Sequence, residues 1–184
     1  CSPIFRSFSF LPMSETLVVV GGAAVGKSAL TLRFVRSEFV EVYEPTVEDA
    51  YRKPVETHGQ VGVVEIIDTA GTDQFRTMRD LYYKNSDGFM LVCSVDQPSS
   101  VQEIQEIREQ IVQVKCSDNV PMAIAINKSD MPQDSWKVKL EEIQRLGKLW
   151  KVKVFVTSAK DNTNVEEAFY TLISRTRSEQ NDSS

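Results

Sequence analysis

A glycine-rich segment near the start of the chain has the residue types of a phosphate-binding loop. Residues 21–28 read Gly-Gly-Ala-Ala-Val-Gly-Lys-Ser and fit the pattern G-x-x-x-x-G-K-S. Glycine lets the backbone bend until its N–H groups converge on phosphate oxygens, and a following helix adds its N-terminal dipole. Lys27 can then reach the β- and γ-phosphates, and the Ser28 hydroxyl can ligate Mg²⁺. The motif predicts a nucleoside triphosphate site formed by Gly21, Ala23, Ala24, Val25, Gly26, Lys27, Ser28 and Ala29.

Two later segments carry groups that can distinguish guanine from adenine. They read Asn127-Lys128-Ser129-Asp130 and, after Thr157, Ser158-Ala159-Lys160. Guanine presents N1–H and its 2-amino group side by side, and the Asp130 carboxylate can accept from both. Asn127 can orient the loop and meet N7, the Lys128 stem can lie across the ring, and the Ala159 N–H can donate to O6. Following a phosphate loop, these segments predict a guanine-nucleotide site that includes Ser158 and Lys160.

The elements that must position these groups alternate along the chain. Short apolar runs predict buried strands at 17–20, 61–67, 88–95, 121–126 and 152–156, with a further strand at 47–55. We expect helices at 27–36, 102–115, 135–149 and 164–175. This alternation predicts an α/β fold of the P-loop NTPase type, with a mainly parallel sheet of about six strands and helices on both faces. Ligands of such sheets bind at the carboxyl ends of the strands, where the motifs lie.

Composition narrows the class of protein. The 184 residues, of which 41% are hydrophobic and 26% charged, suit one globular domain. No apolar run approaches the roughly 20 residues of a membrane helix. The net charge of −5 argues against nucleic acid as a partner. Three widely spaced cysteines are a poor disulfide framework and suggest a reducing, cytoplasmic environment. The single histidine, His58, lies in a polar, glycine-containing stretch that predicts a solvated turn.

The two ends of the sequence differ from its middle. We interpret residues 1–12 as a flexible leader or cloning remnant, with a segment that packs its phenylalanines on the domain as the alternative. Residues 13–177 are expected to form the domain, and 178–184 a polar tail that frays. Neither a C-a-a-X box nor a basic run ends the sequence, so we expect membrane association only through a lipidated tail outside it.

With the stretches 39–53 and 68–75, these motifs make the chain resemble a Ras-family small GTPase over residues 13–177. Within that family it is most similar to Rap. In this chain Thr72 follows Asp-Thr-Ala-Gly, with Phe75 and the stretch 78–82 behind it, whereas Ras has a glutamine at the position of Thr72. A P-loop small-molecule kinase is disfavoured because it would not need the whole guanine-reading set.

The resemblance implies two switch loops that respond to GTP and GDP bound with Mg²⁺. The Thr46 hydroxyl would be the second protein ligand of Mg²⁺, and Asp68 would hold a Mg²⁺-bound water. The Gly71 N–H would meet the γ-phosphate, and Tyr43 would close over the phosphates. Phe39 would cover an edge of the guanine. Two alternatives remain open, namely a turn or helix-capping role for Asp68 and a core role for Phe39.

The resemblance also assigns catalysis to Lys27, Thr46, Gly71 and Thr72, and two departures from it affect the expected rate. The Thr72 hydroxyl reaches less far than the glutamine that orients water in Ras. The Ala23 methyl, where Ras and Rap usually have glycine, would crowd a residue arriving from a partner. We therefore expect slow, activator-dependent hydrolysis. The alternative is a signalling module that binds nucleotide with little or no turnover.

The same resemblance implies three kinds of protein partner. An effector with a Ras-binding-type domain would add a strand at 43–52, beside the acidic residues Glu44, Glu48 and Asp49. Val42 lies where related families usually carry a charge, and a solvated acidic loop is the alternative reading of this strip. A nucleotide-exchange factor and a Rap-type GTPase-activating protein would act at the switches.

Overall fold

In the computed structural model, which describes residues 13–40, 48–70 and 76–182, strands and helices alternate along the chain. The strands are β1 (Met13–Gly21), β2 (Glu48–Thr57), β3 (Gln60–Thr69), β4 (Gly88–Ser94), β5 (Met122–Asn127) and β6 (Lys153–Val156). The helices are α1 (Lys27–Arg36), α2 (Arg76–Asn85), α3 (Ser99–Lys115), α4 (Leu140–Trp150) and α5 (Val165–Asp182). A 3-10 turn at Gln133–Ser135 precedes α4. None of the helices in these described ranges is long and apolar enough to cross a membrane.

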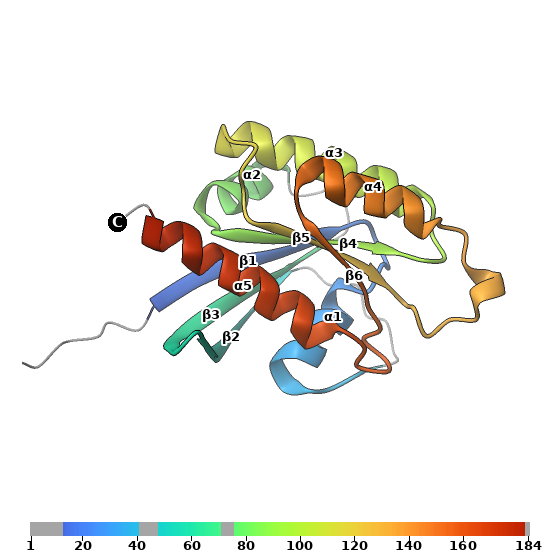
Figure 1. Cartoon of the computed structure of the whole chain (residues 1–184), viewed down its shortest axis with the longest axis horizontal. Coiled ribbons are helices and arrows are strands. Elements are labelled where there is room, and N and C mark those ends of the chain that lie inside the picture. The colour runs from blue at the N-terminus through green and yellow to red at the C-terminus, as the bar shows by residue number, and fades with distance from the viewer. Residues whose placement is uncertain (1–12, 41–47, 71–75, 183–184) are drawn as a thin grey trace, which may run out of the picture.

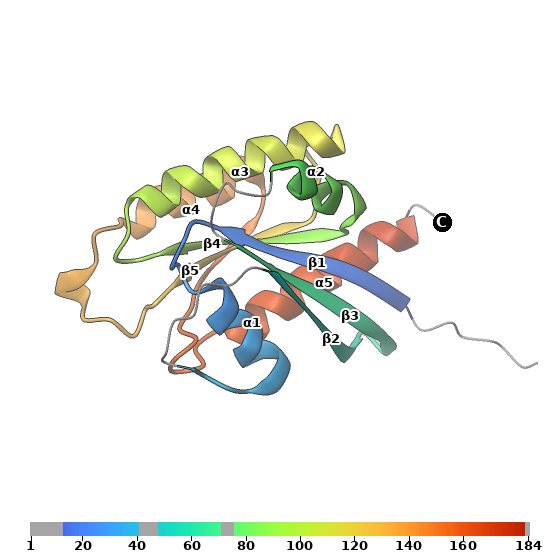
Figure 2. The same ribbon diagram turned by 180° about the vertical axis from the view of Figure 1, so that it is seen from behind.

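The six strands form one sheet in the order β2-β3-β1-β4-β5-β6. Only β2 runs antiparallel to its neighbour, and the other four pairings are parallel. Helices α1 and α5 cover one face, and α2, α3 and α4 cover the other, as Figures 1 and 2 show from opposite sides. The α/β class with a mainly parallel sheet, as expected from the sequence, is confirmed.

The core consists of two layers, one on each face of the sheet, and residues of the central strand β1 contribute to both. Leu17 and Val19 pack towards α1 and α5, where the rings of Phe34 and Phe169 stack with centroids 4.4 Å apart. Val18 and Val20 pack into the opposite layer. Because helices cover both faces of the strand, each of its central residues is buried, and the sequence there is continuously apolar.

The structure differs from the sequence predictions in three helices. Helix α2 was not predicted, and its side chains explain why: Met78 and Leu81 are exposed, so the buried Tyr83 gives little periodic signal. Helix α4 begins at Leu140 rather than at 135, because the 3-10 turn ends at Ser135 and the backbone is extended at Trp136 and Lys139. Helix α5 continues to Asp182, past residue 175 where the sequence predicts its end. The turn predicted at His58 is present, and the residue is exposed.

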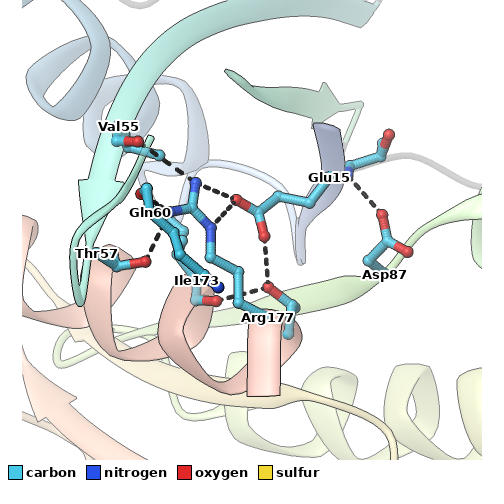
Figure 3. Close-up of polar contacts among 9 residues, drawn as sticks. Glu15, Val55, Thr57, Gln60, Asp87, Ile173 and Arg177 are labelled. Carbon is cyan, nitrogen blue, oxygen red and sulfur yellow. Dashed lines mark hydrogen bonds and ion pairs between the residues drawn. The ribbon is translucent and has the colours of Figure 1, made fainter. Parts of the chain in front are cut away.

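A buried ion pair ties the last turns of α5 to the sheet (Figure 3). The Arg177 guanidinium lies 2.8 Å from the Glu15 carboxylate on β1. It also donates to the Thr57 hydroxyl at 2.6 Å and to the Gln60 carbonyl at 2.7 Å, at the two ends of the β2–β3 turn. The Thr176 hydroxyl donates to the second Glu15 oxygen at 3.0 Å. Burial raises the pKa of Glu15, while the Arg177 guanidinium favours the charged carboxylate. Three elements therefore depend on one arginine.

Arg177→Met should lower the free energy of unfolding by about 3–5 kcal/mol, because it leaves the Glu15 carboxylate buried without its cation. Adding Glu15→Gln should recover part of that loss. Arg175→Met is the matched control, since its pair with Glu179 lies at the surface of the same helix and contributes at most about 1 kcal/mol. Urea unfolding measures all of these variants. Equal losses for Arg177→Met and Arg175→Met would contradict the role given to the buried pair.

Candidate functional site

The loop between β1 and α1 has the backbone of an anion cradle. A Cβ built on Gly21 would collide with the Val92 carbonyl, so the loop leaves β1 closer to β4 than any larger residue permits. Ala24 and Gly26 have φ angles of 59° and 98°, which turn the chain into α1. Gly26 is the N-cap of α1, and among the described residues no side chain caps that end. The first N–H groups of the helix can thus bind an anion.

Lys27 is buried at this end of α1, with its cation poorly compensated. Its Nζ donates to the Gly22 carbonyl at 2.6 Å. Burial lowers the pKa of Lys27 to about 8, although the negative charges of Asp68 and Glu103 act in the opposite direction. A phosphate oxygen would supply the counter-charge that the ammonium lacks. Of the other predicted loop residues, Val25 is buried in the core, Ala29 packs against it, and Ala23 and Ala24 are exposed.

Asp68, near the end of β3, is a buried carboxylate suited to a divalent cation. Neither of its oxygens has a hydrogen-bond partner within the described part of the chain. Burial raises its pKa to about 6, although the nearby Ser28 hydroxyl and the Lys27 ammonium favour the charged form. Buried polar atoms almost always have a partner, and hard cations such as Mg²⁺ take oxygen ligands or their bound waters. Asp68 and Ser28 together therefore fit the cation that the sequence predicts.

The Asn127 side chain joins the phosphate loop to both guanine-reading segments. Its amide Nδ2 donates to the Val25 carbonyl at 3.0 Å. Its Oδ1 accepts from the Ala159 N–H and from the Thr157 hydroxyl, each at 3.4 Å. A Cβ at Gly26 would overlap the Asn127 amide, so this contact requires glycine there. Loops that are far apart in the sequence thus meet at one buried amide.

Asp130 is held with its carboxylate at the surface. The Ser158 hydroxyl donates to Asp130 Oδ1 at 2.7 Å, which orients the carboxylate while the residue remains exposed. From α1, Arg33 donates to the carbonyls of Ala159 at 2.7 Å and Lys160 at 3.0 Å. These contacts fix the loop that would face O6 of a guanine.

The structure adds Asp96 to the residues expected from the sequence. Its carboxylate lies 3.4 Å from Lys128 Nζ and accepts from the Ser94 hydroxyl. Although burial acts in the opposite direction, these partners lower the pKa of Asp96, which keeps its charge beside Lys128. Asp96 follows the carboxyl end of β4. That position at the end of a strand is the feature by which the sequence could have indicated it.

Glu103 in the first turns of α3 is the second addition. A Cβ built on Gly22 would lie 2.6 Å from its carboxylate carbon, so the carboxylate packs against the phosphate loop. Glu103 belongs to the segment predicted as a helix, and its periodicity gave no sign that this face meets a loop 80 residues away.

Several expected site residues have other surroundings or lie outside the described ranges. Phe39 is half-buried against the α1–α5 layer, with the Arg33 guanidinium carbon 5.9 Å from its ring centroid, so it has part of the alternative core role. Tyr43, Thr46, Gly71 and Thr72 lie outside the described residues, as do Val42 and Glu44. Asp49 is exposed on β2, an edge strand of the sheet.

In a comparison with known protein families, one family matches the part of the chain that carries these residues. The model of the Ras family matches residues 16–178. The matched region runs from β1 into α5 and includes the phosphate loop, Asp68 and both guanine-reading segments.

Asp68 should make the nucleotide- and metal-free protein less stable as the pH rises from about 4 to 6. Its folded pKa of about 6 lies above the ordinary 3.8, so in this window the folded state holds a proton that the unfolded state has lost. The stabilisation is present below pH 4, and about 2–3 kcal/mol of it is lost by pH 6 to 7. Asp68→Asn should remove this component in urea unfolding with EDTA, whereas the exposed Asp161→Asn should not. Parallel pH profiles for all three proteins would show that Asp68 has no such effect.

Proposed function

The chain belongs to the Ras family of GTP-binding switches, and on that basis we propose that it binds GTP or GDP with Mg²⁺, engages effectors when GTP is bound and hydrolyses GTP slowly. The observation that carries this proposal is the Asn127 side chain, which holds the phosphate loop and the base-reading loops in one site. Asp130, held by Ser158, then faces the donors of guanine. Within the family we propose a Rap-like member, because Thr72 lies where Ras has a glutamine.

Ser28 and Thr46 would hold the magnesium ion through their hydroxyls, and Asp68 through a water. When bound, the ion would supply positive charge for the β- and γ-phosphates. The orphaned, buried carboxylate of Asp68 supports this arrangement, because a cation would compensate it.

Hydrolysis in this proposal depends on placing charge and water. Lys27 brings a buried ammonium to the phosphates, and the Gly71 N–H adds a donor. Phosphoryl transfer gains most from such positioning and electrostatic stabilisation. Thr72 offers only a short hydroxyl to orient the water, and the exposed Ala23 methyl narrows the approach of a partner's residue. Intrinsic hydrolysis is therefore slow, and faster turnover depends on an activator.

Partners would bind where the site meets the surface. An effector with a Ras-binding-type domain would add a strand along 43–52, and the free edge of β2 with its exposed Asp49 supports this mode. A nucleotide-exchange factor and a Rap-type GTPase-activating protein would act on the switch loops that contain Thr46 and Thr72.

Asp130→Asn should weaken GDP binding by about 3 kcal/mol, because a charge-assisted pair of hydrogen bonds is lost. The same variant should bind XDP better than the unmodified chain does, since the 2-oxo group of xanthine accepts rather than donates. Titration with both nucleotides measures this exchange of preference, with the exposed Asp134→Asn as control. Unchanged GDP affinity in Asp130→Asn would overturn the guanine assignment.

Thr72→Gln should raise the intrinsic rate of GTP hydrolysis, because a carboxamide can orient the attacking water. Ala23→Gly should instead restore the response to a Rap-type activator. In related systems the arginine that an activator inserts into the site raises the hydrolysis rate by about 10³–10⁵. Single-turnover hydrolysis with and without the activator separates these effects. If the unmodified chain already matches Thr72→Gln, another residue orients the water. If none of the variants hydrolyses GTP, the non-hydrolysing signalling module is the better description.

A further inference from the structure

The phosphate loop has an acidic neighbour that no step of the proposed function uses. Glu103 lies in the first turns of α3, which begins at Ser99 after the carboxyl end of β4. A Cβ on Gly22 would lie 2.6 Å from its carboxylate carbon and 3.2 Å from Oε1. The carboxylate therefore occupies the space that an alanine side chain would fill, directly against the loop backbone.

Gly22 lies between this carboxylate and the buried ammonium of Lys27. Its carbonyl accepts from Lys27 Nζ at 2.6 Å. The charge of Glu103 reaches the ammonium, since Asp68 and Glu103 are the two negative groups that raise the pKa of Lys27 against the larger effect of burial. No hydrogen bond or ion pair within the described residues takes up the Glu103 charge itself. A negative charge thus lies beside a loop built to bind anions, and among the described residues it is offset by the Coulombic attraction of Lys27 rather than by a hydrogen bond or ion pair.

Because phosphates carry negative charge into this loop, they must approach the Glu103 carboxylate. Like charges repel more strongly in a partly buried site than in water, and GTP brings one more negative charge than GDP. We propose that Glu103 limits the affinity for nucleotide, an inference that rests on the proposed nucleotide binding. Its carboxylate repels the bound phosphates, speeds nucleotide release and disfavours GTP more than GDP. It acts through charge and touches no reacting atom.

Gly22 offers a second, independent way to move this charge. It is not among the glycines with positive φ, so an alanine there meets no backbone strain. The three atoms nearest to its methyl all belong to the end of the flexible Glu103 side chain, which can turn away at little cost. Gly22→Ala therefore displaces the carboxylate, whereas Glu103→Gln keeps its shape and removes its charge.

The experiment compares release of a fluorescent GDP and of a non-hydrolysable GTP analogue from the magnesium-loaded proteins. Glu103→Gln and Gly22→Ala should each slow release by about tenfold, with a larger effect for the GTP analogue. The double variant should be no slower than the slower single variant, because both changes act on one charge. Raising the salt concentration should shrink the differences. Glu106→Gln is the matched control, since it removes the same charge from an exposed position one turn further along α3 and should release at the unmodified rate.

Three results would overturn the inference. Release from Glu103→Gln at the unmodified rate would show that the charge is not felt. An equal effect of Glu106→Gln would show that nucleotide release responds to the net charge of the protein and not to the position of Glu103. Multiplying effects in the double variant would show that Gly22→Ala acts by another route. Failure of the unmodified chain to bind any guanine nucleotide would overturn the proposed function as well, whereas binding with unaltered release rates would overturn this inference alone.

Discussion

The arrangement of the loops proposed to bind nucleotide depends on one buried amide. Asn127 is almost fully enclosed, and both ends of its side chain are used: the Nδ2 group binds the phosphate loop and the Oδ1 atom binds the segment at Ala159. An ionised carboxylate in its place could only accept hydrogen bonds, and so could not donate to the phosphate loop. The spacing between the phosphate loop and the segment at Ala159 is therefore held in part by a single side chain at the end of β5. The parallel order of the sheet is what brings those loops within its reach.

Around this amide the site holds charges that the fold alone does not satisfy. The Lys27 ammonium and the Asp68 carboxylate are both buried. Burial lowers the pKa of Lys27 and raises the pKa of Asp68, which favours the neutral form of each. Buried charged groups of this kind, which lower the stability of the fold, usually occur where a protein binds a ligand. An anion and a cation bound together would relieve both groups, and whatever binds only the folded state also stabilises it. If nucleotide and cation bind there as proposed, we expect their binding to be coupled to folding.

The sequence predicted those parts of the structure whose cause is local. Strands such as β1 stood out because burial on both faces requires an unbroken apolar run, and the phosphate loop stood out because its glycines serve backbone geometry. Helix α2 escaped prediction since its stripe of buried residues is too sparse. Asp96 and Glu103 escaped it for a different reason: each acts across a contact between segments far apart in the chain, which no spacing reports. Only the fold shows that Gly22 lies against α3.

The hydrogen bonds made by Arg177 also provide a path for mechanical load. A force that reached Arg177 along α5 would pass through the guanidinium to Glu15 of β1 and to the β2–β3 turn. These anchor points lie near the start of β1, while the phosphate loop begins where that strand ends. Such a force would be shared between the central strand and the edge hairpin, and the phosphate loop lies at the opposite end of β1 from Glu15.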